Sequence, residues 1–400
     1  MHGNYKMTED DFLGSHHQKF PVTVEKGLGA KVWDINNKEY IDCMGGYGVA
    51  LVGHRNPRVV AALKAQLDKI ITVHTSLYSK TREEFLENLI KVAPKGLSQV
   101  HLGNSGAEAV EAAIKFARKS TGKSGMIAMN GSYHGKSLGA LSITFNPKYR
   151  KSFMPLVEKV DFAPFGDIEA LRSKINKDTA FIIMEPIQGE SGIIVAPDGF
   201  LQDVRRLCDE NGILLIFDEI QSGLGRTGKM WACQHWNTAP DIMCLAKGIA
   251  GGVPMSATLV RPDILASISK GEHSSTFGGN PLSCAAGTAT LQALTQDGLV
   301  DNAAAVGKIF MDGLEKLKQK HSVVREVRGK GLMIGIEMKF EIKDILFDAI
   351  KEGVLLLYSG RNILRLLPPL VITEQEIKKV LEVLDRLFAK EAERRKNAQG

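Results

Sequence analysis

The chain has 400 residues, 44% hydrophobic and 24% charged, a composition typical of a globular protein large enough for two domains. No apolar run is long enough to predict a transmembrane helix, and the N-terminus lacks the apolar stretch of a secretory signal. The five cysteines include no CxxC pair, which favours reduced thiols over a disulfide framework or a zinc site. The formal net charge of +6 comes without a concentrated Lys/Arg stripe, so we expect no binding of nucleic acid. From the cysteines and the lack of a long apolar run we expect a cytoplasmic protein that binds no membrane or metal.

The N-terminal third of the chain mixes strand and helix patterns. The stretch from about Ala30 to Asp42 predicts a hairpin of two short strands around a polar Asn-Asn turn. Apolar residues then recur at helical spacing over about 58–71 and 81–92. SQVHLGNSG (98–106) predicts a strand that enters a turn, and AEAVEAAIKFARK (107–119) predicts a strong helix.

The middle of the chain alternates strands with helices. TAFIIMEPIQG (179–189) and ILLIFDEIQSG (213–223) are continuous apolar runs, the kind of strand that is buried on both faces, and SGMIAMNGSYHG (124–135) is a further strand and loop. Such strands with intervening helices predict an α/β fold with a mostly parallel sheet. Ligands of these sheets bind beyond the carboxyl ends of the strands, where several polar clusters of this chain stand.

The pattern changes after about Asp297. An amphipathic helix (302–321), a strand pair (324–340) and a final helix (373–395) predict a second, smaller α+β domain. We therefore expect a large domain over 46–296 and a small domain over 297–400, which the N-terminal segment 1–45 joins.

GLGRTGK (223–229) fits the GxxxxGK pattern of a phosphate-binding P-loop. Met230 stands where such a loop needs Ser or Thr for magnesium, and the acidic strand runs directly into the loop instead of following it. The pattern therefore does not indicate a nucleotide hydrolase.

LAKGIAGGVP (245–254) places one lysine among glycines and small apolar residues. In isolation, Lys247 is a surface lysine beside a flexible turn. A desolvated lysine, however, has a depressed pKa and becomes a nucleophilic amine. Asp218 ends a buried strand and can pair with a protonated ring nitrogen, while Ser105 and Gly106 open a helix whose amides can meet a phosphate. These parts suit pyridoxal phosphate (PLP), although an ordinary Asn-Ser helix cap explains the last motif equally well.

Over nearly its whole length the chain resembles class III, fold-type I PLP-dependent aminotransferases, the group that includes ornithine and acetylornithine aminotransferases. The resemblance rests on motifs in the family's order: GHRNP, NSGAEAVEAAIKFAR, YHGKSLGALS, EPIQGE, DEIQSGLGRTG, LAKGIAGGVP, STFGGNP and LRLLPPL. It implies a large, mostly parallel-sheet domain, a smaller α+β domain and PLP as cofactor.

The resemblance also implies roles for the residues around the cofactor. Lys247 would hold PLP as a Schiff base and then act as general base and acid for the proton shift. Asp218 would keep the pyridinium nitrogen protonated, Gln221 would lie near the phenolic oxygen, and Tyr133 would stack on the ring, where phenylalanine is common.

By the same resemblance, Ser105 and Gly106 would bind the phosphate. Thr276 would reach the phosphate held by the neighbouring subunit, which implies a homodimer with shared active sites. On sequence alone, Thr276 would be a hydroxyl at a strand edge.

Four residues are implied to contact substrate. Arg365 matches the arginine that binds the α-carboxylate of 2-oxoglutarate or glutamate, and Glu190 matches the glutamate that masks it when a terminal amine reacts. Lys136 departs from the arginine that acetylornithine enzymes usually carry, and it lacks the planar fork that grips a carboxylate. Ser275 matches a position that contacts acylated substrate.

The sequence thus predicts transfer of a δ- or ε-amino group from an acylated or carrier-linked ornithine or lysine to 2-oxoglutarate, giving a semialdehyde and glutamate, in arginine or lysine biosynthesis. The net positive charge is compatible with an acidic amino-group carrier protein as partner. Free ornithine and 4-aminobutyrate are alternative donors. A glutamate-semialdehyde-type aminomutase, which tends to lack an equivalent of Arg365, and a non-catalytic PLP-fold binding module remain less favoured alternatives.

Overall fold

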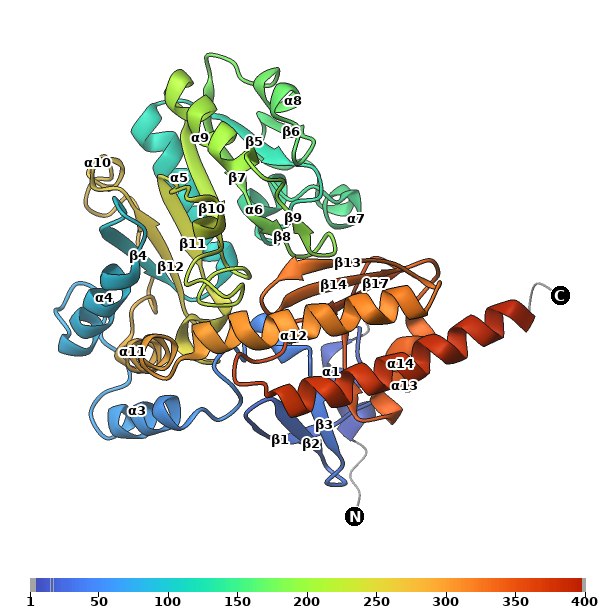
Figure 1. The fold of residues 1–400 in the computed structure, drawn as a ribbon. Coiled ribbons are helices and arrows are strands. Elements are labelled where there is room, and N and C mark those ends of the chain that lie inside the picture. The colour runs from blue at the N-terminus through green and yellow to red at the C-terminus, as the bar shows by residue number, and fades with distance from the viewer. Residues whose placement is uncertain (1–4, 15, 17, 398–400) are drawn as a thin grey trace.

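A computed structural model describes residues 5–14, 16 and 18–397. At its centre is a seven-stranded sheet (Figure 1), with the strands in the spatial order β4 (Gln99–Gly103), β12 (Ser256–Val260), β11 (Ile242–Leu245), β10 (Leu214–Asp218), β7 (Thr179–Met184), β5 (Gly125–Met129) and β6 (Val160–Ala163). β12 pairs antiparallel with both of its neighbours, and the pairs from β11 to β6 are all parallel. The predicted, mostly parallel α/β sheet is confirmed.

The continuous apolar runs follow from burial on both faces of this sheet. Side chains alternate between the faces of a strand, so Phe181 and Ile183 pack with α5 (Gly106–Thr121), whereas Ile182 and Met184 pack in the cluster that contains α9 (Phe200–Asn211). All six residues of β7 are buried. A strand between two helical layers has no polar face to show to water.

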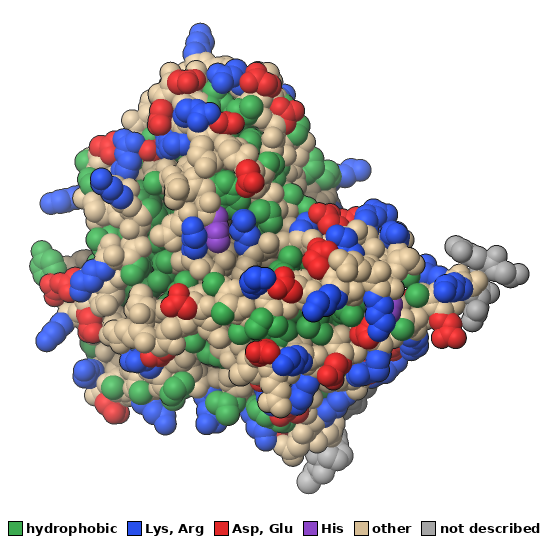
Figure 2. Space-filling model, in the orientation of Figure 1, with side chains coloured by type: hydrophobic (Ala, Val, Ile, Leu, Met, Phe, Trp, Pro, Cys, Tyr) green, Lys and Arg blue, Asp and Glu red, His purple; other side chains and the backbone are tan. Residues whose placement is uncertain are grey.

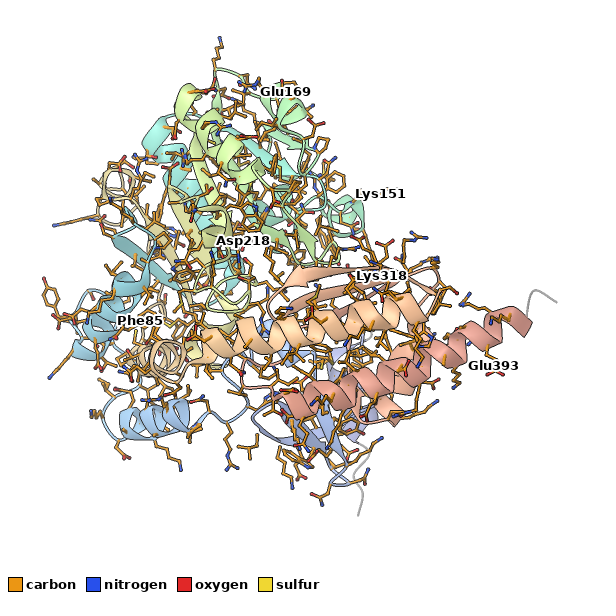
Figure 3. The ribbon with its side chains drawn as sticks, viewed as in Figure 1. Phe85, Lys151, Glu169, Asp218, Lys318 and Glu393 are labelled. Atoms are coloured by element: carbon orange, nitrogen blue, oxygen red, sulfur yellow. The ribbon has the colours of Figure 1, made fainter. Side chains whose placement is uncertain are left out.

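Further helices complete this part of the molecule: α3 (Pro57–Leu67), α4 (Lys80–Val92), α6 (Leu138–Ser142), α7 (Pro147–Arg150), α8 (Ile168–Arg172), α10 (Pro262–Leu265) and α11 (Pro281–Gln296). α4 packs on α11, where Phe85, labelled in Figure 3, lies so close to Gly287 that a Cβ there would be 2.6 Å from its ring. α3 ends four residues before the predicted limit of about 71, because Leu67, Ile70 and Ile71 are each about half exposed and do not continue its buried face.

The second sheet has four strands, in the order β13 (Val324–Lys330), β14 (Met333–Met338), β17 (Ile363–Leu366) and β16 (Leu357–Ser359). α12 (Leu299–Lys320) packs on β13 and on α14 (Glu374–Asn397), and the two long helices run side by side in Figure 1. α13 (Lys343–Lys351) also contacts α14. The predicted helix, strand pair and final helix are all present.

The N-terminal hairpin belongs to a third sheet, with the order β1 (Val24–Leu28), β2 (Lys31–Asp34), β3 (Glu39–Asp42) and β15 (Val354–Leu355). β3 pairs in parallel with β15, so the first strands of the chain join a segment more than three hundred residues later. The domain limits at 45 and 296 stay predictions.

The remaining elements are short: α1 (Tyr5–Leu13), α2 (Gly45–Gly48), the strands β8 (Ile187–Gln188) and β9 (Ile194–Val195), and the 3-10 helices η1 (Lys151–Phe153), η2 (Ala232–Trp236) and η3 (Lys247–Ala250). Charges of both signs are interspersed over the face in Figure 2. All five cysteines are buried and unpaired. Within the described ranges, no helix is long and apolar enough to cross a membrane, and no three His, Cys, Asp or Glu side chains are grouped to hold a metal.

Candidate active site

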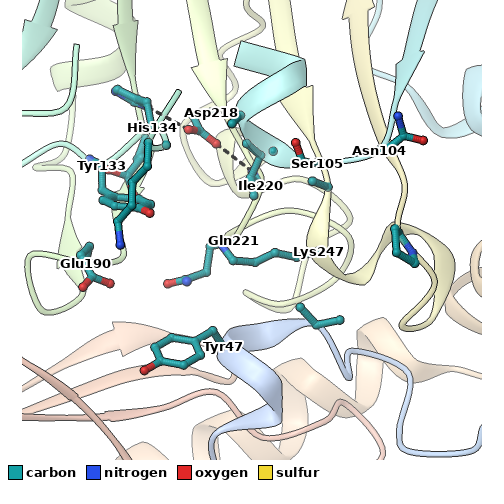
Figure 4. Close-up of a pocket in the computed structure, with 18 of the residues that line it drawn as sticks. Tyr47, Asn104, Ser105, Tyr133, His134, Glu190, Asp218, Ile220, Gln221 and Lys247 are labelled. Carbon is teal, nitrogen blue, oxygen red and sulfur yellow. Dashed lines mark hydrogen bonds and ion pairs between the residues drawn. The ribbon is translucent and has the colours of Figure 1, made fainter. Parts of the chain in front are cut away.

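A cavity of about 990 Å³ opens at the carboxyl ends of the parallel strands (Figure 4). Its walls come from the segments that follow β4, β5, β7, β10 and β11. The antiparallel β12 begins at this same edge, so residues 252–255 close the wall beside β11. The position is the one expected for a ligand site in such a sheet.

Lys247 lies in the short link between β11 and β12. It begins η3 in the left-handed conformation, with φ of 47°, and its side chain lines the cavity. Burial lowers the pKa of its amine, while the carboxylates of Asp218 and Glu185 act in the opposite direction. The surface-lysine interpretation is therefore wrong: Lys247 is a partly buried residue in the wall of a cavity, and the pKa of its amine is lowered toward nucleophilic function.

Asp218 ends β10 with a buried carboxylate that is fixed from two sides, as the dashed lines in Figure 4 show. Its Oδ1 accepts a hydrogen bond from the amide of Ile220 at 3.0 Å, and its Oδ2 lies 2.8 Å from Nδ1 of His134. The other ring nitrogen of His134 is buried and has no partner within the part of the chain that the structure describes. His134 orients the carboxylate, and the sequence analysis did not identify it.

Glu185 is a second buried acid at the cavity, just beyond β7. Its Oε1 accepts from the amide of Tyr133 at 3.0 Å, and its Oε2 accepts from the amide of Gly189 at 2.9 Å. Burial raises the pKa of this carboxyl to about 7. Glu185 therefore fixes the backbone of the predicted ring-stacking residue, Tyr133, whose side chain lines the cavity.

Gln221 follows Asp218 closely and also faces the cavity. Its side chain packs on Gly189, where a Cβ would be only 2.1 Å from Oε1 of Gln221. This buried Oε1 has no hydrogen-bond partner among the described residues. Gln221 thus lines the cavity beside Asp218 and Lys247 while its Oε1, buried against Gly189, has no partner in the described part of the chain.

Ser105 caps α5, as the ordinary helix-cap interpretation expects. Its Oγ accepts from the amide of Glu108 at 3.3 Å, and the Glu108 carboxylate accepts from the amides of Asn104 and Ser105 at 2.5 and 2.8 Å. The next two amides, of Gly106 and Ala107, have no intrahelical partner at a helix start and line the cavity. The cap and the anion site are compatible, because they use different amides.

Arg365 of β17 is fully buried, at 0% side-chain exposure. Its Nη1 donates to the carbonyl of Gly189 at 2.9 Å and lies 3.0 Å from Oε2 of Glu190, which is 34% exposed. Nε and Nη2 are buried without a partner in the described chain, and the ring of Tyr47 lies 5.9 Å from the guanidinium carbon. One arm of the fork is engaged, and the other two nitrogens are buried without a partner in the described chain.

Lys136 is exposed at the wall of the cavity. Its Nζ lies 5.0 Å from the centre of the ring of Tyr149, whose hydroxyl donates to Oε1 of Glu190 at 3.2 Å. Tyr149 was not among the predicted site residues. No motif pattern distinguishes it from the other aromatic residues of the chain.

Ser275 and Thr276 do not line this cavity. Oγ of Ser275 accepts from Nδ2 of Asn104, a wall residue, at 3.1 Å, and Thr276 is exposed. An exposed Thr276 outside its own cavity is compatible with the predicted contact in a neighbouring subunit, which stays a prediction together with the substrate contact of Ser275.

The GxxxxGK stretch forms turns and no phosphate cradle. No α-helix follows it before η2, and Arg226 inside it is fully buried, with Nη1 donating to the carbonyls of Leu332, at 3.2 Å, and Pro368.

Comparisons with known proteins agree with this geometry. Residues 12–388 match the family model for class-III aminotransferases. The chain belongs to the class III aminotransferases.

Among the relatives of this aminotransferase, the acetylornithine aminotransferase of Methanopyrus kandleri is 44% identical over 383 residues, which cover 95% of this chain and 98% of the relative. The [LysW]-aminoadipate semialdehyde transaminase of Deinococcus radiodurans is 45% identical, with 93% and 87% covered. The structure of the ornithine aminotransferase of Toxoplasma gondii, reported with partial occupancy of PLP at its active site, aligns with a TM-score of 0.95 at 32% identity and covers 98% of this chain and 95% of that one.

Class III aminotransferases use PLP, and this chain is a PLP-dependent transaminase. The described residues fit the cofactor: the cavity is lined by the amine-bearing Lys247, by Asp218 with its buried carboxylate, and by Gln221, whose Oε1 has no partner in the described chain. At Gly106 a Cβ would be 3.0 Å from Cδ1 of Ile220, so the helix start is narrow and suits glycine. The PLP prediction is confirmed, whereas the role of each residue stays a proposal.

The structure brings most of the predicted site residues into one cavity: Ser105, Gly106, Tyr133, Lys136, Glu190, Asp218, Gln221 and Lys247 line it, and Arg365 reaches it through Glu190. Sequence reasoning missed His134, Glu185 and Tyr149. His134 and Glu185 stand inside quoted motifs (YHG and EPIQGE), so each was available as a polar residue just after a predicted strand.

Proposed function

We propose that this aminotransferase moves the terminal δ- or ε-amino group of an acylated or carrier-linked ornithine or lysine to 2-oxoglutarate, giving a semialdehyde and glutamate. The pair of Arg365 and Glu190 carries this proposal: a fully buried guanidinium with two unused nitrogens faces a carboxylate that is one-third exposed and can move. The names of the Methanopyrus and Deinococcus relatives support acylated or carrier-linked donors and a place in arginine or lysine biosynthesis.

The cofactor would be held at both of its ends. Lys247 would carry PLP covalently through its amine, and Asp218, oriented by His134, would stabilise a proton on the ring nitrogen. Gln221 would lie near the ring oxygen, Tyr133 would stack on the ring, and the hydroxyl of Ser105 with the amide of Gly106 would bind the phosphate. When bound, PLP supplies an electron sink for the carbon that loses a proton.

Lys247 would also move the proton in the reaction. Its amine, with a lowered pKa, would accept a proton from the carbon that bears the amino group and return it two atoms further along, as a 1,3-proton shift requires. The link between β11 and β12 keeps the amine in place, because both of its ends belong to the central sheet.

Arg365 would receive the α-carboxylate of 2-oxoglutarate or glutamate. When the donor reacts through its terminal amine, Glu190 would pair with Arg365 and neutralise it, as it does here at 3.0 Å. When the oxoacid binds, Glu190 would leave, and the unused Nε and Nη2 would complete a bidentate contact. One cavity would thus accept two substrates of different charge.

The partners proposed with this function are a second copy of the chain, through Thr276, and an acidic carrier protein for a linked donor. The name of the Deinococcus relative supports the carrier, and a cytoplasmic location stays a prediction. Free ornithine or 4-aminobutyrate is the second candidate donor. Lys136 favours it, because lysine offers only a point charge where the planar fork of an arginine would hold the far carboxylate of the acylated substrate.

The test is the rate at which each donor changes the visible absorbance of the loaded enzyme without oxoacid. We expect N-acetylornithine or a carrier-linked lysine to react at least about tenfold faster than free ornithine or 4-aminobutyrate, and Lys247→Ala to abolish the change with every donor. A faster reaction with free ornithine or 4-aminobutyrate would replace the leading donor class with the second one.

A further inference from the structure

The carboxylate of Glu190 is held on two sides. Arg365 pairs with its Oε2 at 3.0 Å, and the hydroxyl of Tyr149 donates to its Oε1 at 3.2 Å. The carbonyl of the same residue accepts from the hydroxyl of Ser359, so the backbone at Glu190 is anchored to β16. Movement of Glu190 away from Arg365 is therefore a movement of its side chain, and Tyr149 is a direct partner of that side chain.

Tyr149 is itself well placed to act as a fixed donor. It lies in α7, whose start is capped by Asn146, with Oδ1 accepting from the amide of Lys148 at 3.0 Å. Its ring makes an edge contact with Tyr133, with centroids 5.8 Å apart, and lies under the ammonium of Lys136 at 5.0 Å. Burial and the charge of Glu190 raise the pKa of Tyr149 to about 12, so the hydroxyl keeps its proton.

We propose that Tyr149 is a specificity-determining residue: its hydroxyl stabilises Glu190 in the position that masks Arg365 and so sets how readily the site accepts a dicarboxylic oxoacid. This inference rests on the proposed exchange of Glu190 for a substrate carboxylate. In the structure the hydroxyl contacts Glu190 in its paired position, so loss of the hydroxyl weakens that position. The equilibrium then shifts toward a free Arg365, which favours 2-oxoglutarate and glutamate over the donor that reacts through its terminal amine.

The size of the effect follows from the strength of the contact. A hydrogen bond to a charged group contributes more than a neutral one, but Glu190 is one-third exposed and water can replace part of it. We therefore expect Tyr149→Phe to bind a dicarboxylate about three- to tenfold more tightly. Phenylalanine keeps the ring that Tyr133 and Lys136 contact, so the substitution tests the hydroxyl alone.

The experiment measures the dissociation constant of glutarate, an unreactive dicarboxylate, by calorimetry on the loaded enzyme. It compares the wild type with Tyr149→Phe, Glu190→Ala and the double variant, and KM values for 2-oxoglutarate and for the amino donor are measured in parallel. Tyr358→Phe is the matched control. Tyr358 lines the same cavity, but its hydroxyl donates to Gln18 and not to Glu190. We expect this control to change the glutarate constant less than about twofold.

The proposal predicts tighter glutarate binding for Tyr149→Phe and for Glu190→Ala, and no further gain from Tyr149→Phe once Glu190 is absent. If Glu190→Ala tightens binding and Tyr149→Phe leaves it unchanged or weaker, the role of Tyr149 is wrong and the exchange stands. An equal gain from Tyr149→Phe with and without Glu190 also overturns it. If Glu190→Ala does not tighten binding, the exchange itself is wrong, and the inference fails with it.

Discussion

At the scale of single residues, Glu185 links two parts of the site that have different tasks. Its carboxylate bonds the amide of Tyr133, next to the proposed cofactor ring, and the amide of Gly189, whose carbonyl accepts from Arg365. Burial is the first cause of its raised pKa, and Asp218 adds to it, while His134 and the two amides act against it. A carboxyl with a pKa of about 7 changes its charge near neutral pH.

This property predicts a dependence of stability on pH. Because the pKa rises from 4.5 in the ordinary state to about 7 in the fold, folding takes up a proton between these values. The free energy of unfolding of the wild type should fall relative to Glu185→Gln as the pH rises from about 5 to about 8, by up to about 3 kcal/mol. Urea midpoints of the PLP-free proteins measure it. A difference that does not vary with pH would show that Glu185 does not titrate in this window.

The sequence predicted the residues that stand directly after strands in recognisable motifs, among them Lys247, Asp218 and Gln221. It did not predict the partners that orient them. His134 contacts a residue 84 positions away, Glu185 bonds an amide 52 positions away, and Tyr149 reaches across 41 positions. Each contact exists only after the strands are ordered in the sheet, and no local pattern records that order.

At the scale of elements, periodicity predicted the buried strands and long helices well, because one physical cause, burial of an apolar face, produces both pattern and structure. It predicted α3 to be longer than it is, because the apolar residues at 67–71 remain half exposed. The antiparallel direction of β12 was not predicted either. Its residues 256–260 are all buried, and burial gives no information about strand direction.

For two glycines, Gly189 after β8 and Gly248 in η3, we expect different outcomes of the same substitution. In Gly189→Ala the new Cβ meets the flexible end of Gln221 at 2.1 Å, so we expect a melting temperature within a few degrees of wild type but about tenfold weaker binding of PLP. In Gly248→Ala the Cβ meets Cβ of Leu51 at 2.5 Å, which cannot rotate away, and we expect a loss of about 1–3 kcal/mol. Melting curves and PLP titrations separate the two effects. Full PLP affinity in Gly189→Ala would contradict the proposed position of Gln221.

At the scale of the whole molecule, Arg226 joins the loop after β10 to the second sheet. Its guanidinium donates to the carbonyls of Leu332, between β13 and β14, and Pro368, which follows β17, and its own carbonyl accepts from the amide of Leu332 at 3.0 Å. Burial lowers the pKa of Arg226 to about 9, so it remains charged at neutral pH. The loop that carries Gln221 and the strand that carries Arg365 are thereby fixed to each other.

We expect Arg226→Met to loosen this junction. The two carbonyls lose their donor inside the core, so hydrogen exchange should accelerate in peptides that cover 331–333 and 366–370, and KM for 2-oxoglutarate should rise several-fold as Arg365 loses its support. Arg325→Met, which removes an exposed arginine from the neighbouring strand β13, is the control. Unchanged exchange in both segments would mean that the junction is held by other contacts.

Lys247 occupies a position that is unfavourable for a lysine in a folded chain. The fold places its amine in the wall of the cavity, where burial lowers its pKa, and gives the residue a backbone conformation, with φ of 47°, that asparagine or glycine adopts more easily. Replacement of Lys247 by asparagine or glycine would relieve the backbone conformation and remove the proposed Schiff-base amine. The proposed role of Lys247 therefore sets selection for activity against selection for folding at position 247.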